Sequence, residues 1–212
     1  MRSDLLAFCE RVAGQDAASQ VLNVIQDQKS YGLATIHPYG FYIWKLPSIS
    51  PHYALRVHVW LPATRNRQVP DWPPHSHNSN LHSFVLAGKV SNLTWQWVND
   101  PSGQNQLYDV GYEGPLSKLT RTNEIGRLEA KTEETFLPAS DYLVPTGIFH
   151  ASEVVQGLSS VTLVLLEKET TGVSQVVGET SGHPNYIFDR LDASESEQRE
   201  ARGAAFEAIM QI

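Results

Sequence analysis

The chain has 212 residues, of which 41% are hydrophobic and 18% are charged, and its formal net charge is −7. This composition supports a folded core and excludes a disordered chain. The acidic balance and the lack of a basic stripe argue against nucleic-acid binding, and no apolar run reaches the ~18 residues of a membrane span. Residues 1–8 make a poor signal peptide, and Cys9 is the sole cysteine. No internal disulfide can therefore form, and we expect a cytoplasmic protein.

Helical patterns occupy both ends of the chain. In residues 4–28, apolar positions recur at helical spacing on both sides of Gly14. In residues 192–212, Ser194 and Glu197 fit a capping box at the start of a helix. An apolar stripe is expected at Phe206, Ile209 and Met210.

Between these ends the pattern is that of short strands separated by Gly and Pro, with no long helical pattern between them. We predict strands at residues 41–46, 53–60, 92–98, 106–112, 127–137, 141–144 and 160–167. Residues 99–103 should form a turn, and residues 61–74, 113–126 and 179–192 should be loops. This arrangement favours an antiparallel sandwich or barrel over a sheet with alternating helices.

Two histidine motifs are the strongest chemical signal. His75 and His77 lie two residues apart, so on an extended chain their side chains face the same side. His150 follows a turn in which Pro145 fixes φ and Gly147 supplies backbone freedom. Three nitrogen ligands can hold a divalent metal and leave room for water, dioxygen or substrate, as a catalytic site requires. Imidazole suits iron, zinc, copper and nickel alike, so the motifs leave the metal open.

His82 has two interpretations. If strict alternation continues from His77, residues 81, 83, 85 and 87 face the interior and His82 faces outward. A bulge of one residue would turn His82 inward, as a fourth ligand or as a support for the other ligands.

The predicted strand at residues 53–60 carries a candidate substrate contact. Arg56, His58 and Trp60 share one face of it. If that face lines the barrel, Arg56 can clamp a substrate carboxylate through two hydrogen bonds; otherwise it lies on the outer face beside an acidic neighbour.

Other polar residues are weaker candidates. Lys45 is a second potential anion contact, and Tyr42 and Tyr142 are either proton donors near the metal or residues of the core or rim. His37 lies in a turn-forming sequence and is interpreted as a loop residue.

The two motifs resemble those of the cupin superfamily. His75-x-His77 with Gly88 eleven residues on, and Pro145-x-Gly147-x-x-His150, match the spacing of its two motifs, and the resemblance covers roughly residues 40–168. The sequence departs from the family pattern at the leading glycine of each motif and at a later asparagine. These positions hold Val69, Ala139 and Val154.

The position of the family's glutamate ligand falls on Leu81, so no carboxylate completes the site. A three-histidine site without glutamate resembles the thiol dioxygenases of the superfamily, which bind ferrous iron. Residues 56–60 also resemble the strand that enters the metal loop in that subgroup. The cysteine that is crosslinked to a tyrosine in some members has no counterpart here, which weighs against cysteine as the substrate.

The resemblance implies a single all-β domain, residues 1–212. Its fold would be a cupin double-stranded β-helix, a jelly-roll barrel with a core of about residues 40–168 and flanking helices in 4–28 and 192–212. The implied function is that of a mononuclear non-heme iron oxygenase with Fe2+ on the three histidines, acting with O2 on a small anionic or sulfur-containing molecule.

Two alternatives stay open. One is a lyase, isomerase or hydrolase that uses Zn2+, Ni2+ or Mn2+ as a Lewis acid. The other is a cupin that binds a small molecule without catalysis. We expect neither a nucleic-acid partner nor a membrane, and a homodimer is an open option because cupins are often dimers.

Overall fold

The computed structural model describes residues 17–27, 32–46, 51–62, 69–155, 157–168 and 172–211. The predicted helical residues before Ala17, and Cys9 with them, lie outside these ranges. No helix within the ranges is long and apolar enough to cross a membrane.

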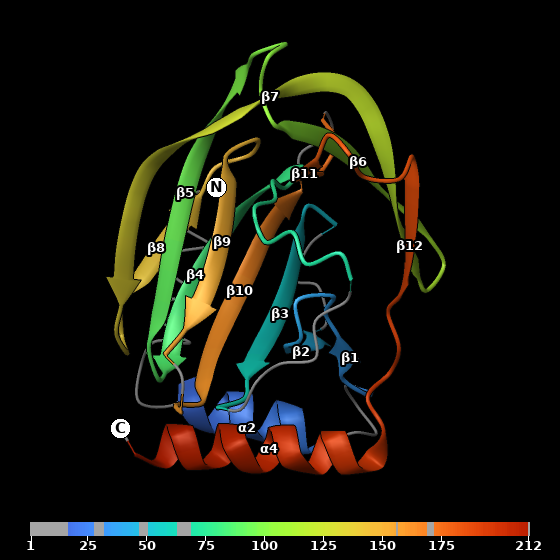
Figure 1. The fold of residues 1–212 in the computed structure, drawn as a ribbon. Coiled ribbons are helices and arrows are strands. Elements are labelled where there is room, and N and C mark those ends of the chain that lie inside the picture. Colours follow the sequence, from blue (N-terminus) through green and yellow to red (C-terminus); the bar gives the residue numbers. More distant parts are fainter. Residues whose placement is uncertain are drawn as a thin grey trace.

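Two antiparallel six-stranded sheets form the body of the described chain (Figure 1). The first sheet has the order β1 (Thr35–Ile36), β2 (Tyr42–Leu46), β3 (Tyr53–Trp60), β10 (Ser160–Lys168), β4 (Ser79–Ala87), β8 (Asp141–Val144). The second has the order β11 (Gln175–Glu179), β6 (Asn105–Glu113), β7 (Leu116–Phe136), β5 (Val90–Asn99), β9 (Phe149–Val154), and β12 (Asn185–Asp189) pairs with β7. The predicted all-β fold of antiparallel strands is confirmed.

Alternation along the strands divides the core into layers. Leu81, Val85 and Val164 from the first sheet pack with Val90 and Val154 from the second, which places this cluster between the sheets. The opposite face of the first sheet packs against α2 (Ala17–Gln26) and α4 (Glu195–Met210). Both helices therefore lie outside the barrel, side by side at the bottom of Figure 1.

The helix at the end of the chain begins as predicted, with a capping box. The Ser194 side chain accepts from the Glu197 backbone, and the Glu197 carboxylate accepts from the Ser194 backbone over 2.8 Å. The predicted apolar stripe is wrong in two of its three members, because Phe206 and Met210 are exposed. The buried face consists of Gln198, Ala201, Ala205 and Ile209.

Two segments predicted to be loops are strands. Residues 116–126 form the first half of the long β7, which pairs with β6 and β12. Within residues 179–192, β12 alternates an exposed Ile187 with the partly buried Tyr186 and Phe188. The loop prediction failed because neither segment shows a polar face against an apolar face. Their strand structure comes from pairing with each other and, for residues 116–126, with β6.

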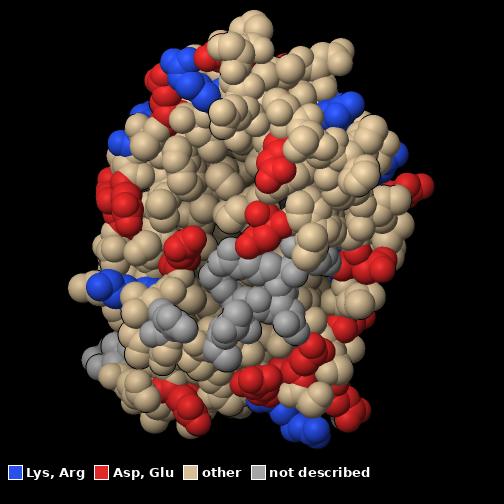
Figure 2. Space-filling view, viewed as in Figure 1, with Lys and Arg blue, Asp and Glu red and all other residues tan. Residues whose placement is uncertain are grey.

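Surface charge is dispersed on the face shown in Figure 2. Lys and Arg side chains lie there in small separate groups near the edges, among more numerous acidic groups. The expected absence of a nucleic-acid partner, the homodimer and the cytoplasmic location stay predictions.

Candidate metal centre

The first histidine motif lies on a short extended segment, residues 74–77, between β9 and β11, the two edge strands of the second sheet. His75 and His150 of β9 exchange both backbone hydrogen bonds, over 3.0 Å and 2.8 Å. On the other side, the Val177 backbone of β11 donates to Pro74 over 2.9 Å. Residues directly opposite in an antiparallel pair point their side chains to the same face. Backbone pairing is therefore what brings the two distant motifs together.

Three imidazoles form a group that could hold a metal ion. His75, His77 and His150 each offer one nitrogen, and these atoms all lie within 4.8 Å of one another. Nε2 of His77 and Nε2 of His150 are 3.0 Å apart. That is about the separation of two nitrogens bound at right angles to one metal at ~2.1 Å.

Neighbouring acceptors orient two of the rings. His75 Nδ1 lies 2.8 Å from the Pro73 carbonyl oxygen, which can only accept, so Nδ1 carries the proton and Nε2 keeps its lone pair. His150 Nδ1 lies 2.9 Å from Asn92 Oδ1, with the same consequence. Metal-binding histidines are commonly held in this way by a hydrogen bond from the other ring nitrogen.

Burial keeps all three rings neutral. Desolvation lowers the pKa of His75 to about 4, with a smaller lowering by Arg190 and an opposing effect of its hydrogen bond to Pro73. Desolvation also lowers the pKa of His77 and of His150 well below the ordinary value, with further lowering by the neighbouring histidines. Only neutral imidazole offers a lone pair to a metal, so the group is ready to bind one at neutral pH.

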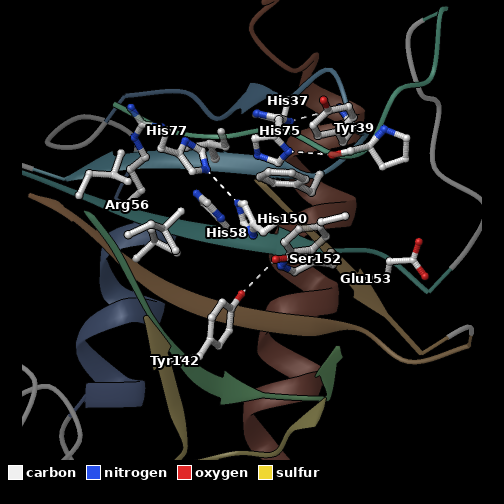
Figure 3. Close-up of a pocket in the computed structure, with 18 residues that line it drawn as sticks. His37, Tyr39, Arg56, His58, His75, His77, Tyr142, His150, Ser152 and Glu153 are labelled. Carbon is white, nitrogen blue, oxygen red and sulfur yellow. Dashed lines mark hydrogen bonds between the residues drawn. The ribbon is translucent and has the colours of Figure 1, made fainter. Parts of the chain in front are cut away.

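The histidines line a cavity of about 60 Å³ inside the barrel (Figure 3). Arg56, His58 and Trp60 of β3 line the same cavity, so the face that carries them points inward. Because one water needs roughly 10–15 Å³ of such volume, the cavity has room for about four to six waters. Its apolar wall includes Phe41, Ile43, Leu81, Val164 and Leu166.

Arg56 is the cation of this cavity. Desolvation lowers its pKa, and the nearby Arg190 guanidinium adds to that effect. Within the described ranges no carboxylate forms an ion pair with Arg56. A partly buried arginine of this kind is suited to bind an anion, although its role as a carboxylate clamp stays a prediction.

Tyr142 also reaches the cavity. Its hydroxyl lies 3.2 Å from Ser152 Oγ, and burial raises its pKa, so the phenol is protonated at neutral pH. Its role as a proton donor stays a prediction. Tyr42 packs in the cluster under the helices, and Lys45 is exposed, so neither lines the cavity.

The structure leaves His82 outside the histidine group. It lies opposite Leu165 and Leu143 in the first sheet, whereas Leu81 and Ser83 on either side of it are buried. Leu165 belongs to the cluster under the helices, so His82 is on the face away from the cavity. The pairing of β4 with β10 has no bulge at His82. This corresponds to the first of the two interpretations of His82, in which strict alternation turns its side chain outward.

Sequence reasoning missed three residues of the site. His37 is the loop residue that the sequence predicts, and in addition its ring stacks on Phe41 at 4.3 Å and lines the cavity. Tyr39 packs against His75 and donates from its hydroxyl to the Trp72 carbonyl over 2.8 Å. His58 is buried with Nε2 unpartnered within the described chain, and desolvation lowers its pKa to about 3. Only His58 had a signal in the sequence, its place beside Arg56 on one strand face.

Comparisons with known proteins add little. No family model and no curated protein matches the sequence. Among solved structures, the chain is similar to hydroxypropylphosphonic acid epoxidase from S. wedmorenis, with 15% identity, 63% of this chain and 53% of that chain covered, and a TM-score of 0.37. It is also similar to DMSP lyase DddQ from Ruegeria pomeroyi DSS-3, with 16% identity, 68% and 54% covered, and a TM-score of 0.37.

A third similar structure is the cupin domain of Schizosaccharomyces pombe Cnp3, with 10% identity, 61% and 62% covered, and a TM-score of 0.33. The chain spans about half the length of the first two proteins. Similarities this low carry no information about activity or ligand, so a functional conclusion has to come from the residues of the site.

Proposed function

We propose that this protein is a metal-dependent enzyme in which His75, His77 and His150 bind one divalent ion. We further propose that the ion is Fe2+ and that the reaction is an oxygenation of a small anionic or sulfur-containing molecule, similar to that of the thiol dioxygenases. One observation supports this most: three neutral imidazoles converge in a small cavity next to a partly buried arginine that has no counter-ion among the described residues.

The donor set fits a divalent transition metal. Three nitrogens without a carboxylate leave further coordination positions open, which is typical of catalytic sites and not of closed structural ones. A ferrous ion would supply open positions for substrate and dioxygen together with the redox chemistry that oxygenation requires.

The side chains of the cavity would do the rest. Arg56 would bind a substrate carboxylate through two parallel hydrogen bonds and so fix the orientation of the substrate. Phe41, Trp60 and Leu166 line the cavity and would limit the water around a bound substrate. Tyr142 would hold its proton until negative charge develops on the substrate within reach of the phenol.

A second candidate is a lyase, isomerase or hydrolase with the metal as a Lewis acid. The protonated Tyr142 beside Ser152 favours it, because such reactions need a proton donor and no oxidant. Turnover of substrate in the absence of O2 would identify this class.

The first test is metal binding. His150→Ala should lower the metal affinity at least ~10-fold, measured by elemental analysis and competitive chelator titration. His82→Ala is the matched control, a histidine on the other face of the sheet, and should retain full metal content. Unchanged metal content in His150→Ala would refute the proposed centre.

The second test is oxygen consumption. Protein reconstituted with Fe2+ without air should consume O2 when supplied with members of a panel of small thiols and carboxylates. Arg56→Lys keeps the charge but loses the planar fork, so it should raise KM about 10-fold with a smaller change in kcat. Equal KM values in the two proteins would contradict a role for Arg56 in substrate binding.

A further inference from the structure

A second hollow of about 70 Å³ adjoins the cavity of the metal centre. His37, Tyr39, His75 and His77 line both spaces. A ligand bound next to these histidines could therefore extend from one hollow into the other. We call the first hollow the Arg56 lobe and the second the Arg190 lobe, after the arginine that lines each.

The wall of the Arg190 lobe is built from three neighbouring strands. Tyr112 of β6, Ser117 of β7 and Phe188 of β12 lie directly opposite one another, so their side chains share one face. Arg190 follows Phe188 by two residues, and its guanidinium lies over the Tyr112 ring at 4.7 Å. The lobe thus consists of aromatic and apolar surface with one cationic group, and Trp72 completes it.

Two polar atoms in this wall have no hydrogen-bond partner among the described residues. They are Arg190 Nε and Ser117 Oγ, and both are buried. Buried polar atoms are almost always paired, so two orphans on one wall indicate a partner that the protein does not itself provide. No acidic side chain in the described ranges lines this lobe.

Positive charge exceeds negative charge in both lobes. The Arg56 lobe has one acidic side chain, the exposed Glu153, which points away from the histidines in Figure 3. Among the described residues, no carboxylate forms an ion pair with Arg56 or with Arg190. A ligand with two negative charges would balance the two charges of these arginines.

We propose that the substrate carries two anionic groups, one bound to Arg56 beside the metal centre and the other bound to Arg190 and Ser117 in the second lobe. This inference rests on the proposed function and narrows its substrate class from small anions to short molecules with an anion at each end, such as dicarboxylates. The apolar walls of both lobes suit a hydrocarbon segment between the two ends.

Calorimetric binding to the full chain after chelator treatment tests the proposal without any need for turnover. The probes are propionate and butyrate as monocarboxylates and malonate, succinate and glutarate as dicarboxylates. At least one dicarboxylate should bind the wild-type protein ~10-fold or more tightly than either monocarboxylate. Equal affinities for the two classes would overturn the proposal, and this comparison needs no variant.

Arg190→Gln should weaken the preferred dicarboxylate at least ~10-fold and leave the monocarboxylates unchanged. Arg199→Gln removes an exposed arginine of α4 and is the matched control, with no effect on either class. Arg190→Lys, which keeps the charge, should restore part of the affinity. Unchanged dicarboxylate binding in Arg190→Gln would also overturn the proposal.

These results separate the two proposals. Arg190-dependent dicarboxylate binding in a protein that never takes up metal would support the second lobe while refuting the metal centre. Metal uptake and turnover without a preference for dicarboxylates would support the metal centre and refute the role of the second lobe.

Discussion

Asn92 offers the sharpest test of the metal centre, because its effect should depend on whether the metal is bound. Asn92 of β5 lies directly opposite Ser152 of β9, and His150 is the diagonal neighbour on the same face. Its Oδ1 accepts from His150 Nδ1 over 2.9 Å in a buried environment. Replacement by leucine keeps the approximate volume and removes the acceptor.

The size of the effect follows from the two tautomers of His150. Without metal, the proton of His150 can move to Nε2 and be donated to His77 Nε2, 3.0 Å away, so the ring N–H of His150 stays paired in Asn92→Leu. With metal on Nε2, the proton must stay on Nδ1, where the variant offers no acceptor. An unpaired buried donor costs about 1–3 kcal/mol, and the metal-bound state alone would carry that cost. Metal affinity should therefore fall roughly 5- to 150-fold.

Competitive titration with a chromophoric chelator measures this affinity, with cobalt or zinc as an air-stable substitute for iron. Asn99→Leu, at the exposed end of the same strand, is the control and should bind metal as the wild type does. Asn92→Asp should bind at least as tightly, because a carboxylate is a stronger acceptor for the imidazole proton. If Asn92→Leu matched the wild type, the assignment of Nε2 of His150 as a ligand atom would be wrong.

Two further predictions concern stability, both measured by denaturant unfolding of metal-free protein. Ala139 has a φ of 66°, which costs a non-glycine residue ~1–2 kcal/mol. Glycine loses more conformational entropy on folding than alanine, and after this allowance Ala139→Gly should stabilise the protein by about 0.5–1 kcal/mol. Ala204→Gly, on α4, is the control and should destabilise the protein. A loss of stability in Ala139→Gly would contradict the argument. His58 has its pKa lowered to about 3 from 6.5, so below pH 6.5 the unfolded chain takes up a proton that the folded protein refuses. The free energy of unfolding should therefore fall as the pH drops from 6.5 toward 3. Between pH 7 and pH 5, His58 should account for about 2 kcal/mol of this loss, and His58→Leu should remove that contribution. An identical pH dependence of stability in the wild type and the variant would refute this role of His58.

The sequence predicted the parts of the fold that carry a local signal. The strands at residues 53–60 and 141–144 match β3 and β8 in their bounds, because a clear alternation or flanking turn residues define them. The turn glycines behave as expected: Gly88 and Gly147 adopt φ of 78° and 77°. At Gly88 a side chain would also collide with the backbone of Ser159.

Ala139 shows how far the family pattern reaches. It occupies the position of a leading glycine in the second cupin motif, and the backbone there has the left-handed conformation that glycine adopts at no cost. The sequence analysis noted Ala139 only as a departure from the pattern, and its left-handed backbone is a finding of the structure. Val69, at the other leading-glycine position, does not have a positive φ.

The parts that the sequence did not predict depend on long-range pairing. β12 and the first half of β7 have little periodicity of their own, and they become strands by pairing with each other and, for β7, with β6. The Arg190 lobe is built on this pairing, so no local sequence pattern pointed to Arg190. The place of His37 in the cavity wall was not predicted for the same reason, since its loop is positioned beside the histidines by the barrel and not by neighbouring residues.

The backbone pairing that completes the second sheet also brings the three histidines together. Residues 74–77 complete the second sheet by pairing with β9 on one side and β11 on the other, and the same backbone bonds set His75 opposite His150. No hinge or side-chain rearrangement is needed to bring the two motifs together once those bonds form. The position of His77 then follows from alternation, because it faces the same side as His75. A site so dependent on backbone pairing should be rigid, and this favours catalysis, in which small errors in ligand placement are costly.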